Sequence, residues 1–236
     1  MNLLQTWLIL VAAPAEAAAV VRGVTGNAAS TALDREWLAS ELSPAIHLAQ
    51  TGIGKVNAAL AAAHCADPIR YAAVLNLGIC GALPRPQGPL AIGTVIAATR
   101  SIYADEGIAT PHGFVDCDAL GFPLAGGDTP NPHFDGSALV PDNALIDELV
   151  DALRFDTVRA PIATVSTCSG RDDLAAAVAA RTGAAAEAME GAAIAHALAR
   201  LHPVSRFCEL RVVSNTTGNL SLIHISEPTR LRRISY

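Results

Sequence analysis

The stretch IHLAQTGIGKVNAALAAAHC, residues 46–65, decides the fold. Its first five residues form an apolar run of strand length, the turn TGIGKVN (51–57) follows, and an alanine-rich helical segment completes it. Glycines let a chain turn tightly, and the start of a helix offers free backbone N–H groups. A buried strand, a glycine turn and a helix in this order indicate an α/β protein. The turn alone is weak evidence for a ligand, because strand-to-helix glycine turns are common and most bind nothing.

The same alternation of apolar runs and alanine-rich stretches continues along the chain. We expect strands at 7–13, 46–50, 73–77, 94–101, 160–165 and 208–214, and helices at 15–22, 56–65, 143–154, 171–181 and 191–201. Continuous Val, Ile and Leu runs joined by helices indicate a sheet covered on both faces. Two segments rich in Pro, Gly, Asn and Asp, 84–89 and 121–141, are predicted to be loops over a site or an interface.

The composition narrows the class of partner. The 236 residues suit one α/β domain, and the formal net charge of −6 argues against a nucleic-acid or anionic-membrane binder. Charged residues make up only 16%, which suggests that part of the surface is buried between subunits. Five scattered cysteines without a metal-ligand spacing indicate reduced thiols in a cytoplasm and no metal site. The apolar run at 7–15 is predicted to be a buried strand, with a secretory signal as the alternative.

The last sixteen residues differ from the rest of the chain. SLIHISEPTRLRRISY (221–236) contains no Ala and no Gly and carries three arginines. The stretch resembles translated sequencing-adapter sequence, foreign to the domain, with a genuine basic tail as the alternative. We therefore expect a domain at 1–220 and an aberrant tail at 221–236.

Five motifs in one order carry a resemblance to a known superfamily. They are TGIGKVNAA (51–59), NLGICGALP (76–84), IGTV (92–95), AMEGAAIAHAL (188–198) and VVSN (212–215). This order resembles the purine nucleoside phosphorylase and nucleosidase superfamily over residues 7–218. Within it, YADEG (103–107), TPHGF (110–114) and LGFP (120–123) look like futalosine hydrolase. The resemblance implies a three-layer αβα domain with a central mixed β-sheet, a homodimer or higher homo-oligomer, a small purine nucleoside as partner, and no metal or organic cofactor.

The implied reaction is hydrolysis of an N-glycosidic bond: futalosine hydrolase removes hypoxanthine from futalosine in an alternative route to menaquinone. Breaking this bond requires a base for water, contacts that fix the ribose, and hydrogen bonding to the departing purine. By resemblance, Glu16 is the water-activating carboxylate, Glu190 accepts hydrogen bonds from the ribose hydroxyls, and Met189 packs against the sugar. A plain helix-start glutamate and ordinary core packing are the alternatives for these residues.

Asn215 is expected to contact the purine. An amide can both donate and accept, which suits N7 and O6 of hypoxanthine, although an Asn after a strand can also serve only as a turn former. Gly78 and Ile79 lie in NLGICGAL (76–83), which is predicted to be a second glycine turn after a strand. Related phosphorylases often have a Ser at position 79, and no arginine lies near the first strand-to-helix turn in sequence. Water is therefore favoured over phosphate as the nucleophile.

Four further residues are candidate contacts to the substrate. Phe114 and Phe122 could stack on the purine or the aryl end of the substrate, and Ser166 could offer a hydroxyl. His112 could recognise the carboxylate of that end, with a solvated loop histidine as the alternative. In futalosine hydrolases an Arg-Asp pair and a closing helix follow Ser-Asn, but here Leu220 and the tail stand in their place. We therefore hypothesise that this particular chain is impaired, and a fully active 236-residue chain would contradict that.

Three other functions stay open at this stage. A methylthioadenosine or adenosylhomocysteine nucleosidase would release adenine, and a purine nucleoside phosphorylase would need phosphate. A purine-binding protein without turnover belongs to a different class, and it would show saturable binding without release of base.

Overall fold

The computed structural model describes residues 6–26, 36–124, 131–153 and 156–218. Within these ranges the helices are α1 (Pro14–Thr25), α2 (Lys55–Cys65), α3 (Asn143–Ala152), α4 (Asp172–Thr182) and α5 (Gly191–Leu201). The strands are β1 (Trp7–Val11), β2 (Ser40–Ser43), β3 (Ile46–Gln50), β4 (Ala73–Ala82), β5 (Val95–Tyr103), β6 (Gly107–Thr110), β7 (Gly113–Asp116), β8 (Phe134–Asp135), β9 (Ala138–Leu139), β10 (Thr157–Thr164), β11 (Ala186–Ala188) and β12 (Arg206–Thr216). None of these helices is long and apolar enough to cross a membrane.

The main sheet is mixed. Its strand order is β2-β3-β1-β4-β11-β10-β5-β9-β8, and β12 pairs with both β4 and β5. β1 runs parallel to β3 and β4, and β12 runs parallel to β4, whereas β11 pairs antiparallel with β4. Because β12 also joins β5, the strands β4, β12, β5, β10 and β11 close into a ring. The predicted central mixed sheet is confirmed.

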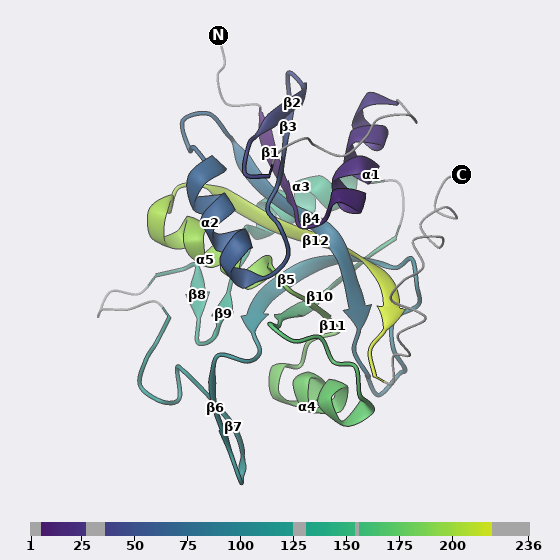
Figure 1. Cartoon of the computed structure of the whole chain (residues 1–236), viewed down its shortest axis with the longest axis vertical. Helices are drawn as coiled ribbons and strands as arrows, with labels where there is room; N and C mark the ends of the chain where they lie inside the picture. The colour runs from purple at the N-terminus through teal and green to yellow at the C-terminus, as the bar shows by residue number, and fades with distance from the viewer. Residues whose placement is uncertain (1–5, 27–35, 125–130, 154–155, 219–236) are drawn as a thin grey trace.

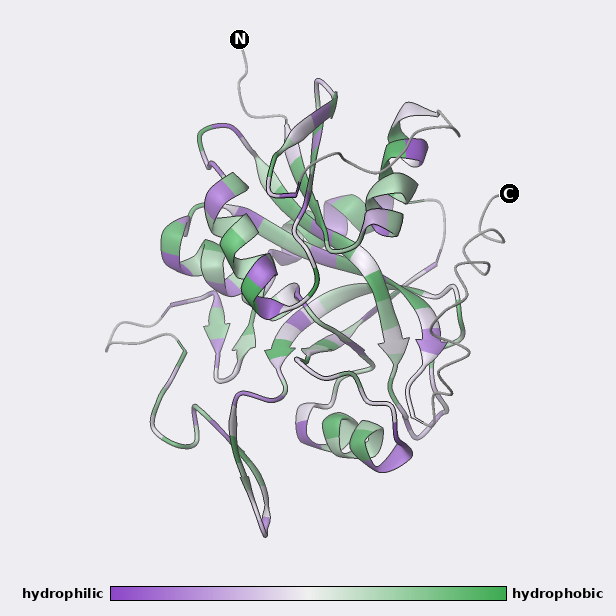
Figure 2. Cartoon of the chain, in the orientation of Figure 1, coloured by the Kyte–Doolittle hydropathy of each residue, from purple (hydrophilic) through white to green (hydrophobic). Residues whose placement is uncertain are grey.

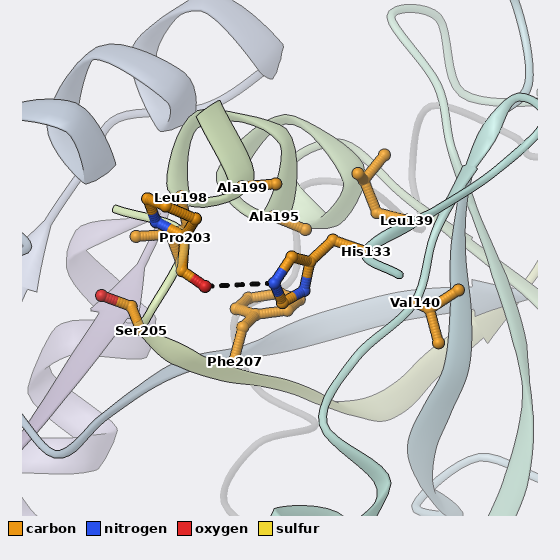
Figure 3. Close-up of a pocket in the computed structure, with 9 residues that line it drawn as sticks. All are labelled: His133, Leu139, Val140, Ala195, Leu198, Ala199, Pro203, Ser205 and Phe207. Atoms are coloured by element: carbon orange, nitrogen blue, oxygen red, sulfur yellow. Dashed lines mark hydrogen bonds between the residues drawn. The ribbon is translucent and has the colours of Figure 1, made fainter. Parts of the chain in front are cut away.

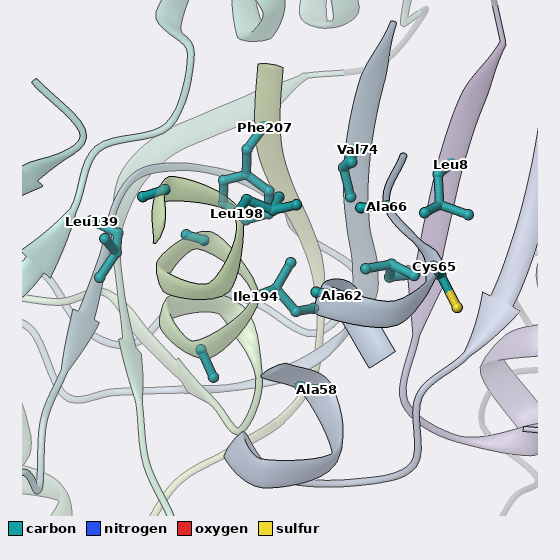
Figure 4. Close-up of a cluster of buried hydrophobic side chains, with 14 of the residues drawn as sticks. Leu8, Ala58, Ala62, Cys65, Ala66, Val74, Leu139, Ile194, Leu198 and Phe207 are labelled. Carbon is teal, nitrogen blue, oxygen red and sulfur yellow. The ribbon is translucent and has the colours of Figure 1, made fainter. Parts of the chain in front are cut away.

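Alternating residues of β1 supply two separate cores. Leu8 and Leu10 point to the face covered by α2 and α5, where Figure 4 shows Ala58 and Ala62 of α2 beside Ile194 and Leu198 of α5. Ile9 and Val11 point to the opposite face. There the core contains Ala17 and Val21 of α1 and Leu145 and Ile146 of α3. Successive side chains of a strand point to opposite faces of the sheet. A continuous apolar run therefore places apolar side chains on both faces, and each face must be covered by helices.

Two features lie outside these layers. Helix α4 packs its buried residues against Leu83 and Val165 at one end of the ring. The hairpin β6–β7 projects from the same end of the molecule (Figure 1). In Figure 2 the central strands are mainly green, and the hydrophilic colour lies mostly on helices and connections. The outer surfaces of the helical layers therefore face solvent while the strands form the core.

The predicted elements are correct in type, and most differ from the structure by a few residues at their ends. The main error concerns the turn predicted at NLGICGAL (76–83), because this segment lies almost entirely within strand β4. Its glycines are needed for space rather than for turning, as described below. The loop predicted at 121–141 contains the short strands β8 and β9, and the sequence pattern does not predict β2, β6, β7 and β11. The tail at 221–236, Leu220 and Arg154 lie outside the described residues.

Candidate active site

Glu16 is the first carboxylate of the site. It lies in the first turn of α1, directly after β1. Its Oε2 accepts the backbone N–H groups of Ala12 (3.0 Å) and Ala13 (2.9 Å), and its Oε1 accepts the N–H of Ile79 (2.8 Å). Two backbone donors directly after β1 and one within β4 therefore fix the half-buried carboxylate beside β4.

Gly78 of β4 provides the space that this arrangement requires. A Cβ at residue 78 would lie 2.6 Å from Glu16 Oε1 and 2.6 Å from Arg211 Nη1. The φ of Gly78 lies outside the left-handed region, so the glycine is required here for close approach and not for backbone freedom. Any larger residue would push into the gap in which the carboxylate of Glu16 and the guanidinium of Arg211 meet.

Arg211 is the buried cation around which the carboxylates of the site gather. It is 1% exposed, its Nε donates to Glu209 Oε1 (2.8 Å), and its Nη1 forms an ion pair with Glu190 Oε2 (3.2 Å). Burial opposes its charge, but Glu209, Glu190 and Glu16 outweigh burial and raise its pKa, so the guanidinium is charged. Sequence reasoning missed Arg211.

Glu209 is the fully buried end of the same network. Its exposed fraction is 0%, and besides Arg211 it accepts hydrogen bonds from Ser101 Oγ (2.5 Å) and Asn76 Nδ2 (3.4 Å). A Cβ at Gly191 would collide with its carboxylate. The sequence did carry a signal for both missed residues: two opposite charges, at 209 and 211, interrupt an apolar strand. Charged residues are rarely buried unless they are paired.

Glu190 joins this network to the first glycine turn. It immediately precedes α5, and its Oε1 accepts the backbone N–H of Gly54 at 3.1 Å. Met189, the residue before it, is half-buried and packs against the core under α4. One N–H of the glycine turn, that of Gly54, thus contacts a carboxylate of the protein in this structure.

Lys55 closes the other side of the glycine turn. Its ammonium pairs with Asp105 and with Glu106 (2.9 Å to Oε1) and lies 5.3 Å from the centre of the Tyr103 ring. Asp105 Oδ2 also accepts the N–H of Ser166 at 2.6 Å. The loop expected to contact substrate is therefore tied to the glycine turn through a carboxylate, with Ser166 using its backbone rather than its hydroxyl for this contact.

These groups lie toward the carboxyl ends of the parallel strands β1, β3, β4 and β12. Ligands of open α/β sheets bind at that edge. A cavity of about 370 Å³ lies at the opposite, amino ends and is lined by Trp7, Ala73 and Arg206 among others. A second cavity of about 10 Å³ lies beside His133, whose Nε2 is 3.1 Å from the carbonyl oxygen of Pro203 (Figure 3), and has room for about one water. Neither is lined by the carboxylates described above.

Comparisons with known proteins agree with this geometry. The profile of the Phosphorylase superfamily matches residues 7–227. The futalosine hydrolase of Acidothermus cellulolyticus is 32% identical over 236 residues, covering 97% of this chain and 87% of that protein. This chain belongs to the phosphorylase superfamily and, within it, to the futalosine hydrolase family.

Other members and neighbours extend the comparison. The futalosine hydrolase of Thermus thermophilus is 38% identical over 172 residues, covering 72% of this chain and 68% of that protein. The native futalosine hydrolase of Helicobacter pylori has a TM-score of 0.68 at 19% identity, covering 95% of this chain and 90% of that one. The methylthioadenosine/adenosylhomocysteine nucleosidase of Neisseria meningitidis, solved with methylthio-immucillin-A, has a TM-score of 0.69 at 24% identity, covering 93% and 90%. The two structures share the fold of this chain.

In this member of the futalosine hydrolase family, the remaining predicted contacts lie at different places. Asn215 lies within β12 rather than in a loop, half-buried, and its Nδ2 donates to the carbonyl of Thr216 at 3.1 Å. Phe114 packs against the Arg181 guanidinium, with 4.8 Å between the guanidinium carbon and the ring centre. Phe122 is 72% exposed and Ile79 is 41% exposed. Their roles toward a substrate stay predictions.

The fold adds a charge that the sequence around the first strand-to-helix turn does not contain. The sequence has no arginine near the first strand-to-helix turn, yet the fold brings Arg211 beside Glu16. The separation of about 200 residues in sequence hid this approach, because β12 pairs with β4 only in the folded sheet. Since Arg211 already pairs with Glu209 and Glu190, its charge is matched by the protein's own carboxylates.

Proposed function

We propose that this chain hydrolyses the N-glycosidic bond of futalosine, releasing hypoxanthine and dehypoxanthine futalosine. One observation carries the proposal: Glu16 and Glu190, 174 residues apart by their numbers (190 − 16), meet at one buried arginine toward the carboxyl ends of the parallel strands. The names of the relatives, futalosine hydrolases from two bacteria, supply the substrate. The menaquinone pathway follows from that substrate.

The proposed chemistry is a substitution at the anomeric carbon of the ribose. Glu16 accepts a proton from water as the water oxygen forms a bond to this carbon, and the electrons of the breaking carbon–nitrogen bond pass to the purine. The purine leaves as an anion and takes up one proton at N7 from solvent, and Glu16 returns the proton that it took from water to solvent, so that the purine is released neutral and the site is restored. Glu190 accepts hydrogen bonds from the ribose hydroxyls, which fixes the sugar and stabilises the positive charge that develops on it.

Other residues support water as the nucleophile and a purine as the leaving group. The apolar side chain of Ile79 offers no hydrogen bond to phosphate, and Arg211 is paired with carboxylates. Asn215 is proposed to donate to N7 or O6 of hypoxanthine, with Met189 against the sugar and Gly78 leaving room beside it. Phe114, Phe122 and Ser166 are kept as proposed contacts to the rest of the substrate.

A homodimer is part of this proposal. Val56 and Leu60, which are 72% and 49% exposed, lie four residues apart on α2, and Ile53, which is 58% exposed, lies in the turn directly before the helix. Such an apolar stripe on the surface is typical of a protein interface. A second copy of this chain is the occupant that we propose, since the low content of charged residues also suggests surface buried between subunits.

The test is chromatographic detection of free purine after incubation with futalosine, methylthioadenosine or inosine, each with and without phosphate. We expect hypoxanthine from futalosine alone, independent of phosphate. Adenine release would identify a related nucleosidase, and dependence on phosphate would identify a phosphorylase. Saturable purine binding with no release from any substrate would favour a binding protein. A fully active chain would also refute the proposal that the tail at 221–236 impairs it.

Variants connect the activity to the site. Glu16→Gln is expected to lower kcat by about 10²–10⁴-fold, because it removes the proton acceptor. Both oxygens of Glu16 accept backbone N–H groups, so the amide leaves at least one of these donors without an acceptor, and a melting temperature is measured beside kcat to separate loss of stability from loss of catalysis. The matched control is Glu148→Gln on α3, whose carboxylate pairs with Arg206 at the opposite end of the strands. A Glu16→Gln variant as active as Glu148→Gln would exclude Glu16 as the base.

A further inference from the structure

Glu187 lies in a position that the reaction described above does not use. Strand β11 places it opposite Gly81 of β4, and strand β12 places Asn215 opposite the same glycine from the other side. A Cβ at residue 81 would lie 3.3 Å from Asn215 Nδ2 and 3.8 Å from Glu187 Cγ. Side chains directly opposite one another share a face of a sheet. Glu187 and Asn215 therefore flank the same glycine, and the methyl group of Thr217 lies 2.7 Å from that Cβ position. The place over Gly81 between Glu187 and Asn215 is called the gap below.

The carboxylate of Glu187 is buried without a cation. It is 3% exposed, and its two oxygens accept the N–H (2.6 Å) and the hydroxyl (2.7 Å) of Ser169. Among the described residues no arginine, lysine or histidine forms an ion pair with it, and Arg181 acts only at longer range. Burial raises the pKa of this carboxyl, although the hydrogen bonds from Ser169 oppose the shift. Buried carboxylates without a cation partner are costly and concentrate at functional sites.

The chemistry of the gap favours a ligand with an N–H group. An ionised carboxylate only accepts hydrogen bonds, and its two oxygens have about four lone-pair sites, of which Ser169 uses two. A 6-oxopurine carries a hydrogen on N1, next to its O6. A 6-aminopurine has a lone pair on N1 instead, which would face the carboxylate and be repelled. Asn215, on the other side of the gap, can donate to O6 or N7.

We propose that Glu187 selects a 6-oxopurine over a 6-aminopurine by accepting a hydrogen bond from the N1–H of the base. This inference rests on the proposed function, since it places the purine over Gly81 between Glu187 and Asn215. Glu187 is then a specificity-determining residue of the purine subsite, and Ser169 orients its carboxylate. If Glu187 only held the loop that contains Ser169, its replacement would weaken both kinds of purine equally.

The experiment compares kcat/KM for futalosine and for its 6-amino analogue in the wild type, Glu187→Gln and Ser169→Ala. The amide of glutamine can donate to the N1 of a 6-aminopurine as well as accept from N1–H. We expect Glu187→Gln to lower the preference for futalosine at least about tenfold, because a site loses discrimination when its hydrogen-bonding partner changes. Ser169→Ala, which keeps the carboxylate, is expected to change both substrates by a similar factor. Equal losses for both substrates in Glu187→Gln would overturn the proposal.

A binding measurement separates this inference from the proposed function. Calorimetry with free hypoxanthine and free adenine requires no turnover, so it applies even if no nucleoside is hydrolysed. We expect the wild type to bind hypoxanthine more tightly than adenine and Glu187→Gln to lose that preference. Wild-type binding of neither base, or an unchanged preference in the variant, would overturn the role of Glu187. If Glu187→Gln does not fold, Glu187→Asp keeps the charge but withdraws it from the gap, and it must also reduce the preference.

Discussion

The site depends on residues whose sizes and charges fit one another closely. Gly78 lets the carboxylate of Glu16 and the guanidinium of Arg211 approach, and Gly191 leaves room for the carboxylate of Glu209. Three carboxylates surround one buried guanidinium. A change of one methyl group at such a place alters the distance between charges, so it should affect catalysis more than folding.

We expect Gly78→Ala to lower kcat/KM by about tenfold or more. The added Cβ would lie 2.6 Å from Glu16 Oε1 and from Arg211 Nη1, and both side chains would have to shift. A misplacement of this size in a catalytic group can cost about 10²-fold. Steady-state kinetics with futalosine, together with a melting temperature, would measure both effects.

Gly23→Ala is the matched control for this variant. Gly23 lies within α1, and a Cβ there would meet nothing within 4 Å. Alanine in a helix interior is about 0.5–1 kcal/mol more favourable than glycine, so this variant should be at least as stable as the wild type and fully active. Equal activity of the two variants would show that the space at Gly78 is unimportant.

At the scale of elements, the junction between α3 and β12 shows how one side chain stabilises two of them. Asp142 is the N-cap of α3, where its Oδ1 accepts the N–H of Leu145 at 2.8 Å. Its Oδ2 also accepts a hydrogen bond from Arg206 Nε at 2.7 Å, at the first residue of β12. The hydrogen bond from Arg206 lowers the pKa of Asp142.

We expect Asp142→Ala to lower the free energy of unfolding by about 1–2 kcal/mol near neutral pH, as loss of an N-cap does. The effect should depend on pH. A folded-state pKa below the unfolded value means that the stabilisation is present above the unfolded pKa of about 4 and is lost as pH falls through the folded pKa. Urea unfolding at several pH values between about 7 and about 3 would therefore show the difference from wild type shrinking toward acid.

Asp142→Asn separates the cap from the charge. Asparagine caps helices about as well as aspartate, so this variant should retain most of the stability near neutral pH. Its difference from wild type should come mainly from the pair with Arg206, which is partly exposed and contributes little. If Asp142→Asn were as unstable as Asp142→Ala, the ion pair and not the cap would stabilise the junction.

At the scale of the whole molecule, the apolar stripe on α2 predicts association. We expect Val56→Asp to convert a dimer into a monomer, because a charge placed in an apolar interface would be buried without a partner. Light scattering after size-exclusion chromatography measures this directly. The control is Ile92→Asp, which is 52% exposed outside α2 and should stay dimeric. A wild type that is monomeric at all concentrations would remove this part of the proposal.

Regular elements were predictable because each depends on a local pattern. The apolar run at 46–50 coincides with β3, and the alanine-rich segment at 191–201 coincides with α5. The short strands β8, β9 and β11 have two or three residues each, too few to show a period. The sequence pattern ends β4 too early, at 77, because glycines follow. Those glycines instead leave space for side chains that are distant in sequence, such as Glu16 and Arg211 at Gly78, and a local pattern does not reveal such neighbours.

The sequence by itself determined the fold class, the family, and two of the carboxylates that meet at Arg211, because motif order and apolar periodicity are written along the chain. Only the tertiary structure decided which groups meet. The pairing of β12 with β4 brings Arg211 and Glu209 close to Glu16 and Glu190. Glu187 and Asn215 lie near each other because β11 and β12 each place one of them opposite Gly81. Hydrogen bonds and ion pairs act over a few ångströms in space, and sequence separation says nothing about that distance until the sheet has formed.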